Sequence, residues 1–391
     1  MARAVDVPRP WHGCGHSFRM AGNTAMKVAI TGAGASVPPL IMTNERLLGM
    51  FPGPRKMPWT PEEFEKKTGI RERRFSFDFD DAAGRPVFPP GYGDAPGPAG
   101  LLAEEALRES LLVAGLDARD LDGLVVGCST PDRLGFGSDA QLLHHRVGMR
   151  PDAAVLQVDA GCGGSVFCLQ WAKEMILSGV RKKVAVVMVQ LVSPLLSRDL
   201  YTGSVVYAGK ENEAFLTALL FGDGAGAVIL QAVDDDSESR IESSATINEY
   251  HEIVVRPAGG NLRPPGMPGI ALSDHAHHVI GRRVADAYAP TMKKMIDHVL
   301  ADARMDIGDI ERFYPHQSNL RLIEQLMDIA GLPEDRTAIN VERYGNTSGA
   351  SVFILLAEDI RNQKVTLGSG DPVVIAAIGA NLQYGAHVVR L

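Results

Sequence analysis

Three segments in the first half of this chain recur, in the same order, in its second half. The members of each pair share glycines, acidic turn residues or the position of an apolar run. The pairs are Leu116–Asp122 with Met305–Glu311, Gly148–Val158 with Gly331–Val341, and Gly224–Leu230 with Gly385–Leu391. Internal repetition is typical of folds built from a duplicated unit. We therefore predict two similar halves related by a pseudo-twofold axis.

The hydrophobic pattern within these halves alternates between a helical period and short extended runs, which predicts a layered α/β fold. We expect helices over 101–114, 138–147 and 164–179, and strands over 27–31, 122–128, 153–158, 183–190, 216–221 and 227–232. An acidic connector that begins at Asp234 separates the halves. The predicted units are residues 1–25 as an N-terminal extension, then 26–232 and 239–391.

Composition favours a cytoplasmic enzyme. Of the 391 residues, 45% are hydrophobic and 22% are charged, which is typical of a globular protein. A net charge of −8 argues against nucleic acid as the main partner. No apolar run reaches the length of a membrane span, and the N-terminus lacks the apolar core of a signal peptide. Four cysteines without a C-x-x-C pair indicate a reducing compartment.

One of these cysteines, Cys162, is a candidate nucleophile. It follows the predicted strand ending at Val158 and precedes the predicted helix that begins at residue 164, with glycines on both sides. Free backbone N–H groups and the helix dipole at such a turn stabilise a thiolate. The glycines let a substrate approach the sulfur closely. The alternative is a small buried apolar residue, which is what most cysteines are.

The repeat suggests partners for this cysteine. It places the Cys162 turn opposite Tyr344-Gly345-Asn346, so that Cys162 and Asn346 would begin two facing helices. The loop that contains His316 would face the same centre. A histidine that converges with a thiol and an amide is a candidate acid–base group or oxyanion donor.

Other motifs predict no cofactor or metal site. Gly32 and Gly34 follow the first predicted strand, but the third glycine of a dinucleotide fingerprint is missing and Pro38 follows. Two histidine clusters lack the further ligands that a metal would need, and we expect a tail without a role and surface or helix-start histidines. These clusters are His12, Cys14 and His16, and His275, His277 and His278.

The sequence resembles the thiolase-fold condensing enzymes, most closely the type III β-ketoacyl carrier-protein synthases. The matching segments occur in the family's order between about Met26 and Leu391. They are Thr68–Arg74, Gly161–Gly164, Leu220–Ala227, Pro315–Leu320 and Tyr344–Ser351. The resemblance implies a five-layered α/β/α/β/α thiolase-like fold, a homodimer and no cofactor.

The resemblance also implies a mechanism. Cys162 would accept an acyl group from a thioester, with the backbone N–H groups of Cys162 and Ala380 as the oxyanion hole. His316 and Asn346 would complete the triad and donate to the enolate of a malonyl- or β-ketoacyl-type thioester. That carbanion would attack the acyl-cysteine, a Claisen condensation of fatty-acid or polyketide type. Acyl carrier protein or coenzyme A would carry the thioesters.

Related activities stay open. Relatives that transfer acyl groups to oxygen or nitrogen tend to have a carboxylate in place of Asn346, so the amide favours condensation over an acyltransferase acting on a hydroxyl or amine. A non-decarboxylative Claisen condensation of two acyl thioesters would need a carboxylate base, for which Asp132 or Asp139 is a candidate. A non-catalytic partner subunit usually lacks the nucleophile, which this chain retains.

Several positions differ from the family pattern or have more than one possible role. Where the family stacks a tryptophan on coenzyme A, this chain has Glu63, with Trp59 one turn earlier, which favours a carrier protein as donor. Insertions over 75–98 and 193–213 favour specialised metabolism. Phe136 is predicted to close a partner's pocket or to be ordinary core, and Asn381 to add a polar group to the pocket. Predicted contacts with the carrier are Arg71, Arg73, Arg74 and Asn319.

Overall fold

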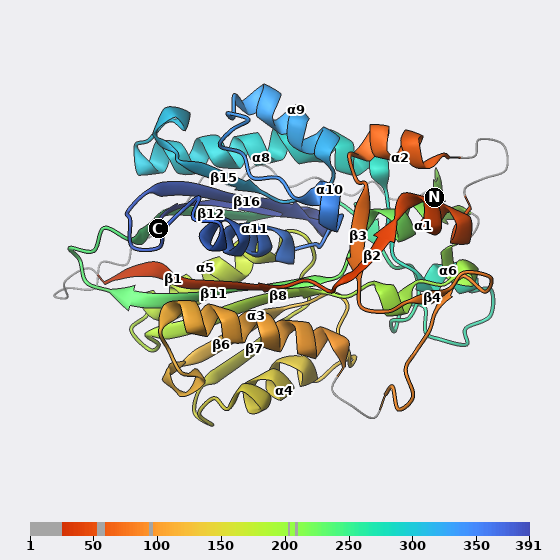
Figure 1. Ribbon diagram of the computed structural model, residues 1–391, viewed down its shortest axis with the longest axis horizontal. Helices are drawn as coiled ribbons and strands as arrows, with labels where there is room; N and C mark the ends of the chain where they lie inside the picture. The colour runs from red at the N-terminus through yellow and green to blue at the C-terminus, as the bar shows by residue number, and fades with distance from the viewer. Residues whose placement is uncertain (1–25, 53–58, 94–96, 202–203, 208–209) are drawn as a thin grey trace, which may run out of the picture.

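The computed structural model describes residues 26–52, 59–93, 97–201, 204–207 and 210–391. Two mixed sheets alternate with helices in five layers, as Figure 1 shows. From one side to the other, the layers are α3 with α4, the first sheet, α5 with α11, the second sheet, and α8 with α9. This is the expected α/β/α/β/α arrangement.

The first sheet has the strand order β1-β11-β8-β6-β7 and is packed between α3 and α4 on one face and α5 and α11 on the other. Its strands are β1 Lys27–Ser36, β6 Gly123–Gly127, β7 Ala154–Val158, β8 Lys183–Gln190 and β11 Gly224–Val233. The helices that cover it are α3 Pro98–Ala114, α4 Ser138–Val147, α5 Gly164–Leu177 and α11 Ala350–Arg361. Strand β8 is buried on both faces, as expected of a central strand.

The second sheet repeats this plan with the order β12-β17-β16-β15. Its elements are β12 Arg240–Asn248, β15 Arg312–Pro315, β16 Pro372–Gly379 and β17 Gln383–Arg390, with α8 Gly281–Ala303 and α9 Leu320–Ala330 outside. Apolar residues of both halves share one core where α5 and α11 pack between the sheets. The two halves therefore do not have separate cores.

The repeat predicted from the sequence corresponds to equivalent elements. Asp117 and Asp306 each cap a short 3-10 helix, which is followed by β6 in the first half and by β15 in the second. Each of these two strands has a parallel neighbour in its own sheet. The match ends at Val341. Val158 ends strand β7, but its counterpart Val341 begins the short helix α10, Val341–Tyr344. In the place of a strand equivalent to β7, the described part of the second half has an isolated bridge between Thr337 and Phe313.

Strand β1 extends further than predicted. Gly32 and Gly34 do not follow the strand but lie within it, where β1 pairs with β11 after a bulge. A Cβ on Gly34 would lie 2.3 Å from the carbonyl oxygen of Ala106 and 2.5 Å from the amide nitrogen of Ser110, both in α3. These glycines therefore allow close packing of helix and strand and do not form a nucleotide-binding loop.

The strand predicted over 216–221 is wrong. Phe215–Leu220 forms helix α7, whose side chains are almost all buried around Phe215 and Leu219. Periodicity cannot distinguish a short apolar run in a buried helix from one in a buried strand, so the sequence offered no way to decide.

The smaller elements gather at the right of Figure 1, beside the ends of both sheets. They are β2 Leu40–Thr43, α1 Asn44–Met50, α2 Pro61–Thr68, β3 Glu72–Phe75, β4 Phe79–Asp80, β5 Arg85–Pro86, α6 Arg198–Tyr201, β9 Ser204–Tyr207, β10 Lys210–Glu213, β13 Val254–Val255 and β14 His278–Val279. The insertion predicted over 75–98 contributes to the core at its start, because Phe75, Phe77 and Phe79 are buried.

His12, Cys14 and His16, for which we expect a tail without a role and no metal site, lie outside the described residues. Within the described part of the chain, no group of three or more His, Cys, Asp or Glu side chains could hold a metal ion. Nor does any helix there combine the length and apolar character needed to span a bilayer.

Two glycines provide a matched test of the packing between β1 and α3. We expect Gly34→Ala to cost about 2–3 kcal/mol of folding free energy, because its methyl group would overlap the α3 backbone. Gly49→Ala, in the exposed part of α1 with open space around it, should instead stabilise by ~0.5–1 kcal/mol. Thermal unfolding of both variants checks this, and an unchanged midpoint for Gly34→Ala would contradict the packing described.

Candidate active site

Cys162 lies at the junction of two cavities, between the end of β7 and the start of α5. The first cavity has a volume of about 580 Å³ and the second about 240 Å³. Cys162, Phe221, Val254 and Ala380 line both. His316 and Asn346 line the second cavity together with Cys162. The structure therefore brings together the three residues predicted as the triad.

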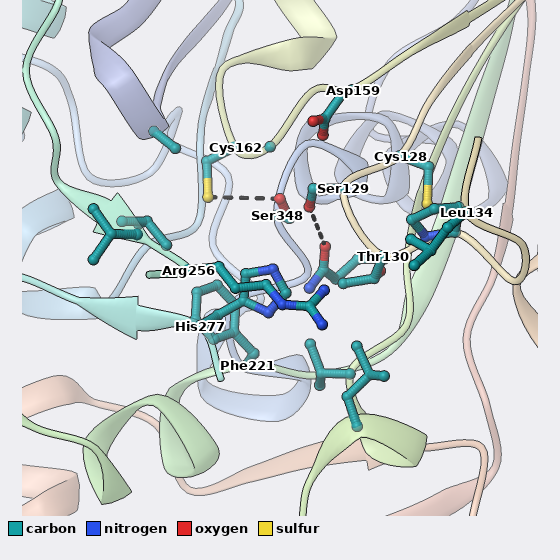
Figure 2. A pocket seen from close by; sticks show the side chains of 18 of the residues that line it. Cys128, Ser129, Thr130, Leu134, Asp159, Cys162, Phe221, Arg256, His277 and Ser348 are labelled. Atoms are coloured by element: carbon teal, nitrogen blue, oxygen red, sulfur yellow. Dashed lines mark hydrogen bonds between the residues drawn. The ribbon is translucent and has the colours of Figure 1, made fainter. Parts of the chain in front are cut away.

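The sulfur of Cys162 has two polar neighbours. Its Sγ lies 3.6 Å from Ser348 Oγ, a contact visible in Figure 2, and 3.9 Å from Asn346 Nδ2. Burial raises the pKa of the Cys162 thiol, while the hydrogen bonds from Ser348 and Asn346 act in the opposite direction. Burial therefore works against the stabilised thiolate expected at this turn and outweighs the favourable polar contacts.

The amide of Asn346 has a defined orientation. The backbone N–H of Ser348 donates to Asn346 Oδ1 over 2.8 Å. Because an N–H can only donate, the oxygen must face it, and the Nδ2 hydrogens are left for the cavity and Cys162. The backbone of Asn346 is also fixed, since it pairs with Leu220 and Gly222 on both sides. Asn346 is therefore positioned as a hydrogen-bond donor.

His316 follows β15 and is 1% exposed. Burial lowers the pKa of His316 to about 3, with the backbone of Ser348 acting in the opposite direction. The imidazole is therefore neutral at physiological pH and can donate from only one ring nitrogen. The hydroxyl of Tyr288, in α8, donates to the carbonyl oxygen of His316 and fixes the loop.

Ser351, which sequence reasoning missed, contacts the His316 ring. Its Oγ lies 3.0 Å from His316 Nδ1 and accepts the backbone N–H of Gln317 over 3.3 Å. The Ser351 hydroxyl can donate to Nδ1 or accept from it, according to the tautomer of the ring. In the tautomer in which Nδ1 accepts, the ring proton lies on Nε2. Only the spatial proximity of α11 to the His316 loop reveals this role.

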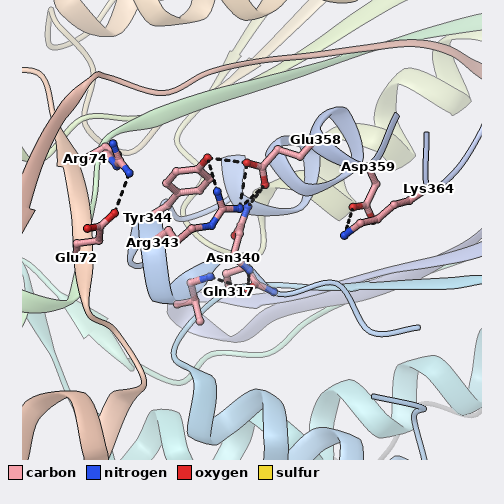
Figure 3. Close-up of polar contacts among 10 residues, drawn as sticks. Glu72, Arg74, Gln317, Asn340, Arg343, Tyr344, Glu358, Asp359 and Lys364 are labelled. Carbon is pink, nitrogen blue, oxygen red and sulfur yellow. Dashed lines mark hydrogen bonds and ion pairs between the residues drawn. The ribbon is translucent and has the colours of Figure 1, made fainter. Parts of the chain in front are cut away.

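The loop before Asn346 is anchored by Glu358 in α11, as Figure 3 shows. This carboxylate accepts hydrogen bonds from Tyr344 Oη at 2.6 Å and Asn340 Nδ2 at 3.0 Å, and it pairs with Arg343 at 3.3 Å. These contacts tie α10 to α11, the helix that follows Asn346. The amide is therefore supported on both sides of its position in the chain.

Ala380 and Asn381 follow β16. A Cβ on Gly379 would lie 2.1 Å from the amide nitrogen of Gly163, so the two backbones touch and Ala380 is brought beside the Cys162 turn. Asn381 adopts a left-handed conformation, with φ 57°, and lines the first cavity as predicted. Asparagine tolerates this conformation better than most residues. The oxyanion role of the Cys162 and Ala380 N–H groups remains a prediction.

Phe136 is not ordinary core. It is 96% exposed, lies between Gly135 and Gly137 in a left-handed conformation with φ 60°, and lines the first cavity. The core alternative is therefore wrong. An aromatic side chain at the rim of a cavity remains available to a second molecule.

The predicted carrier contacts differ in accessibility. Arg71 is exposed and Asn319, the N-cap of α9, lines the second cavity. Arg74 is partly buried and pairs with Glu72 at 2.8 Å. The prediction is wrong for Arg73, which is fully buried and donates to the carbonyl oxygens of Met42 and Leu219.

Trp59 lies beside the second cavity without lining it. The ammonium of Lys67, which does line that cavity, lies 4.1 Å from the centre of the Trp59 ring. The ring also packs against Phe64 and Phe215, with 6.2 Å between centroids in each case. Contacts within the chain therefore already surround this indole.

The carboxylates proposed as a base are engaged elsewhere. Asp132 accepts the N–H groups of Ala99 and Gly100 at the start of α3, and Asp139 accepts the N–H of Asp132. Neither lines the cavities. The carboxylate that does is Asp159, which sequence reasoning missed although it lies three residues before Cys162.

The histidine cluster is also placed differently from our expectation. His278 is 2% exposed and bonds the carbonyl oxygen of Ser273, so it is not a surface residue. His277 lines the first cavity, and burial lowers its pKa to about 4. His277 is therefore neutral and belongs to the site.

Comparison with known proteins shows which family the chain resembles. Models of 3-oxoacyl-[acyl-carrier-protein] synthase III and of its C-terminal part match residues 156–249 and 300–391. The β-ketoacyl-[acyl-carrier-protein] synthase III of Roseiflexus castenholzii is 32% identical over 364 residues, covering 93% of this chain and 97% of that protein.

Solved structures show the same fold. The 3-oxoacyl-[acyl-carrier-protein] synthase III of Aquifex aeolicus superposes with a TM-score of 0.73 at 26% identity, covering 93% of this chain and all of that one. The priming β-ketosynthase of the R1128 polyketide pathway gives a TM-score of 0.73 at 24% identity, covering 95% and 98%. By its sequence, its fold and the residues around Cys162, this chain belongs to the 3-oxoacyl-[acyl-carrier-protein] synthase III family of condensing enzymes.

Proposed function

We propose that this enzyme joins an acyl group carried on Cys162 to a malonyl-type thioester, with loss of CO2. The observation that supports this is the convergence of Cys162, His316 and the Asn346 amide on the second cavity, with no carboxylate among the residues that line it. Hydrogen-bond donors stabilise an enolate oxygen, whereas a carboxylate would repel it.

In the loading step the Cys162 sulfur attacks the carbonyl carbon of an acyl thioester. The carbon–sulfur bond of the donor breaks, and the proton lost from Cys162 ends on the departing thiol. The backbone N–H groups of Cys162 and Ala380 are proposed to hold the oxyanion of the tetrahedral intermediate. Because the resting thiol has a raised pKa, it loses its proton as the attack proceeds.

In the condensation step a malonyl-type thioester enters the second cavity. Loss of CO2 leaves its electron pair on an enolate, whose oxygen accepts hydrogen bonds from His316 Nε2 and Asn346 Nδ2. The enolate carbon then attacks the acyl-cysteine carbonyl, a carbon–carbon bond forms, and the Cys162 thiolate leaves and takes up a proton. A neutral His316 suits this role, since its one N–H can donate to the enolate oxygen.

The loading and condensation steps can be separated by substitution. We expect Cys162→Ala to abolish acylation. His316→Ala and Asn346→Ala should still be acylated but should lose condensation and CO2 release by a factor on the order of 10² or more. Cys168→Ala, which removes a buried thiol away from the cavities, is the matched control. Intact-protein mass spectrometry reports acylation, and product analysis reports condensation.

Three outcomes would contradict the proposal. An acylated enzyme that discharges only onto an added alcohol or amine would identify an acyltransferase. Condensation without release of CO2 would indicate the non-decarboxylative route, for which Asp159 is the carboxylate available in the first cavity. Loss of acylation in the Asn346→Ala variant would place that residue in loading.

Ser351 is proposed as a positioning residue for His316. Ser351→Ala should leave Cys162 acylation intact but lower condensation about tenfold to hundredfold, because the proton on Nε2 is no longer fixed. Ser351→Thr retains a hydroxyl and should restore most of the rate. A merely structural role would instead lower both steps together with the unfolding temperature.

We also propose a homodimer formed along β7. This strand is at the edge of the first sheet, and its Leu156 is 42% exposed. Two further exposed apolar side chains, Leu134 at 76% and Phe136 at 96%, lie on the loop at the rim of the first cavity. An exposed sheet edge with apolar neighbours is a favourable surface for a second copy.

A charged side chain placed on the β7 edge tests the proposed dimer. Leu156→Lys should convert the protein to a monomer, because burying the ammonium in the interface is costly. Leu112→Lys, at an 80% exposed position on α3, should leave the assembly unchanged. Light scattering after size-exclusion chromatography measures both, and a dimeric Leu156→Lys variant would exclude β7 from the interface.

A further inference from the structure

The first cavity is lined by more polar side chains than a site for a plain alkyl chain would need. Figure 2 shows Asp159 on one side of it, Ser129 and Thr130 beyond, and Arg256 and His277 across from them. Gln157, Gln190 and Gln383 add further amides to the lining, which also contains apolar side chains. An alkyl chain would remove water from these groups without replacing its hydrogen bonds, which is unfavourable.

Gln190 provides the strongest indication of a ligand. This residue ends β8, is only 5% exposed and lines the cavity. One end of its amide is engaged, because the Ser129 hydroxyl lies 3.4 Å from Gln190 Oε1. Among the residues whose side chains are described, none accepts a hydrogen bond from its Nε2. A buried amide in a cavity wall whose N–H donors are not used by these residues can bind an acceptor oxygen.

Arg256 adds a second source of donors. Arg256 lines the same cavity, and its guanidinium carries N–H donors in a fixed fork. His277 lies beside it and is neutral. Across the cavity, the Asp159 carboxylate accepts no hydrogen bond from the described residues and can receive one from a hydroxyl. The lining therefore offers donors on one side and an acceptor on the other.

We propose that the acyl group loaded on Cys162 is oxygenated, carrying a ketone or hydroxyl beyond its thioester carbon, and that Gln190 and Arg256 bind that oxygen. This inference rests on the proposed loading of Cys162. A ketone accepts from Gln190 Nε2 or Arg256, and a hydroxyl can in addition donate to Asp159.

The test compares acyl groups that have the same number of carbons. Pantetheine thioesters of hexanoic, 5-oxohexanoic and 5-hydroxyhexanoic acid are offered separately to the full-length enzyme, and acylation of Cys162 is followed by intact-protein mass spectrometry. We expect the two oxygenated groups to load at least about tenfold faster than hexanoyl, because a site that hydrogen-bonds an oxygen discriminates against the analogue that lacks it.

Two variants remove the donors. Gln190→Leu and Arg256→Met should each reduce the ratio of 5-oxohexanoyl to hexanoyl loading several-fold. The ratio is taken within each variant, so any general loss of folded enzyme cancels. Arg119→Met, which changes an exposed arginine between α3 and β6, should leave the ratio unchanged.

The outcomes are distinguishable. Hexanoyl loading as fast as the oxygenated groups, or a ratio unaffected by both variants, would overturn the inference while leaving the condensing function intact. Failure of all three thioesters to acylate Cys162 would instead contradict the proposed function itself. A ratio that falls only in Arg256→Met would contradict the role assigned to Gln190.

Discussion

The backbone of Gly379 lies so close to that of Gly163 that neither residue has space for a side chain. Gly164 and Gly349, at the starts of α5 and α11, are similarly crowded around the methyl end of Met188. These contacts bring the beginnings of two pseudo-symmetric helices together. Cys162 and Asn346 meet for this reason, although they are far apart in the chain, and the geometry of the site depends on that approach.

Buried polar side chains behind the site hold the loops that contain His316 and Asn346 in one position. Gln317 donates to the carbonyl oxygens of Pro315 and Ala338 and accepts the N–H groups of Asn340 and Val341. One fully satisfied side chain thus joins the loop that contains His316 to the one that leads to Asn346. Buried networks of this kind favour a single arrangement, because every alternative leaves a group without a partner.

The repeat was enough to predict the paired halves and the convergence of Cys162, His316 and Asn346, because equivalent turns meet around a pseudo-twofold axis. Helix α7 could not be predicted, since Phe215–Leu220 is too short and, apart from Thr217, too uniformly apolar to show a period. Ser351 and Gln190 were also out of reach. Their importance lies in contacts with residues distant in the chain, and serine and glutamine are common in ordinary positions.

Burial of Cys162 has a consequence for the lifetime of the enzyme. Oxidants and electrophiles attack a thiolate far faster than a thiol. Because burial raises the pKa of Cys162, a smaller fraction of its thiol is ionised than in a free cysteine. The same burial that shapes the acyl pocket thus protects the catalyst between turnovers.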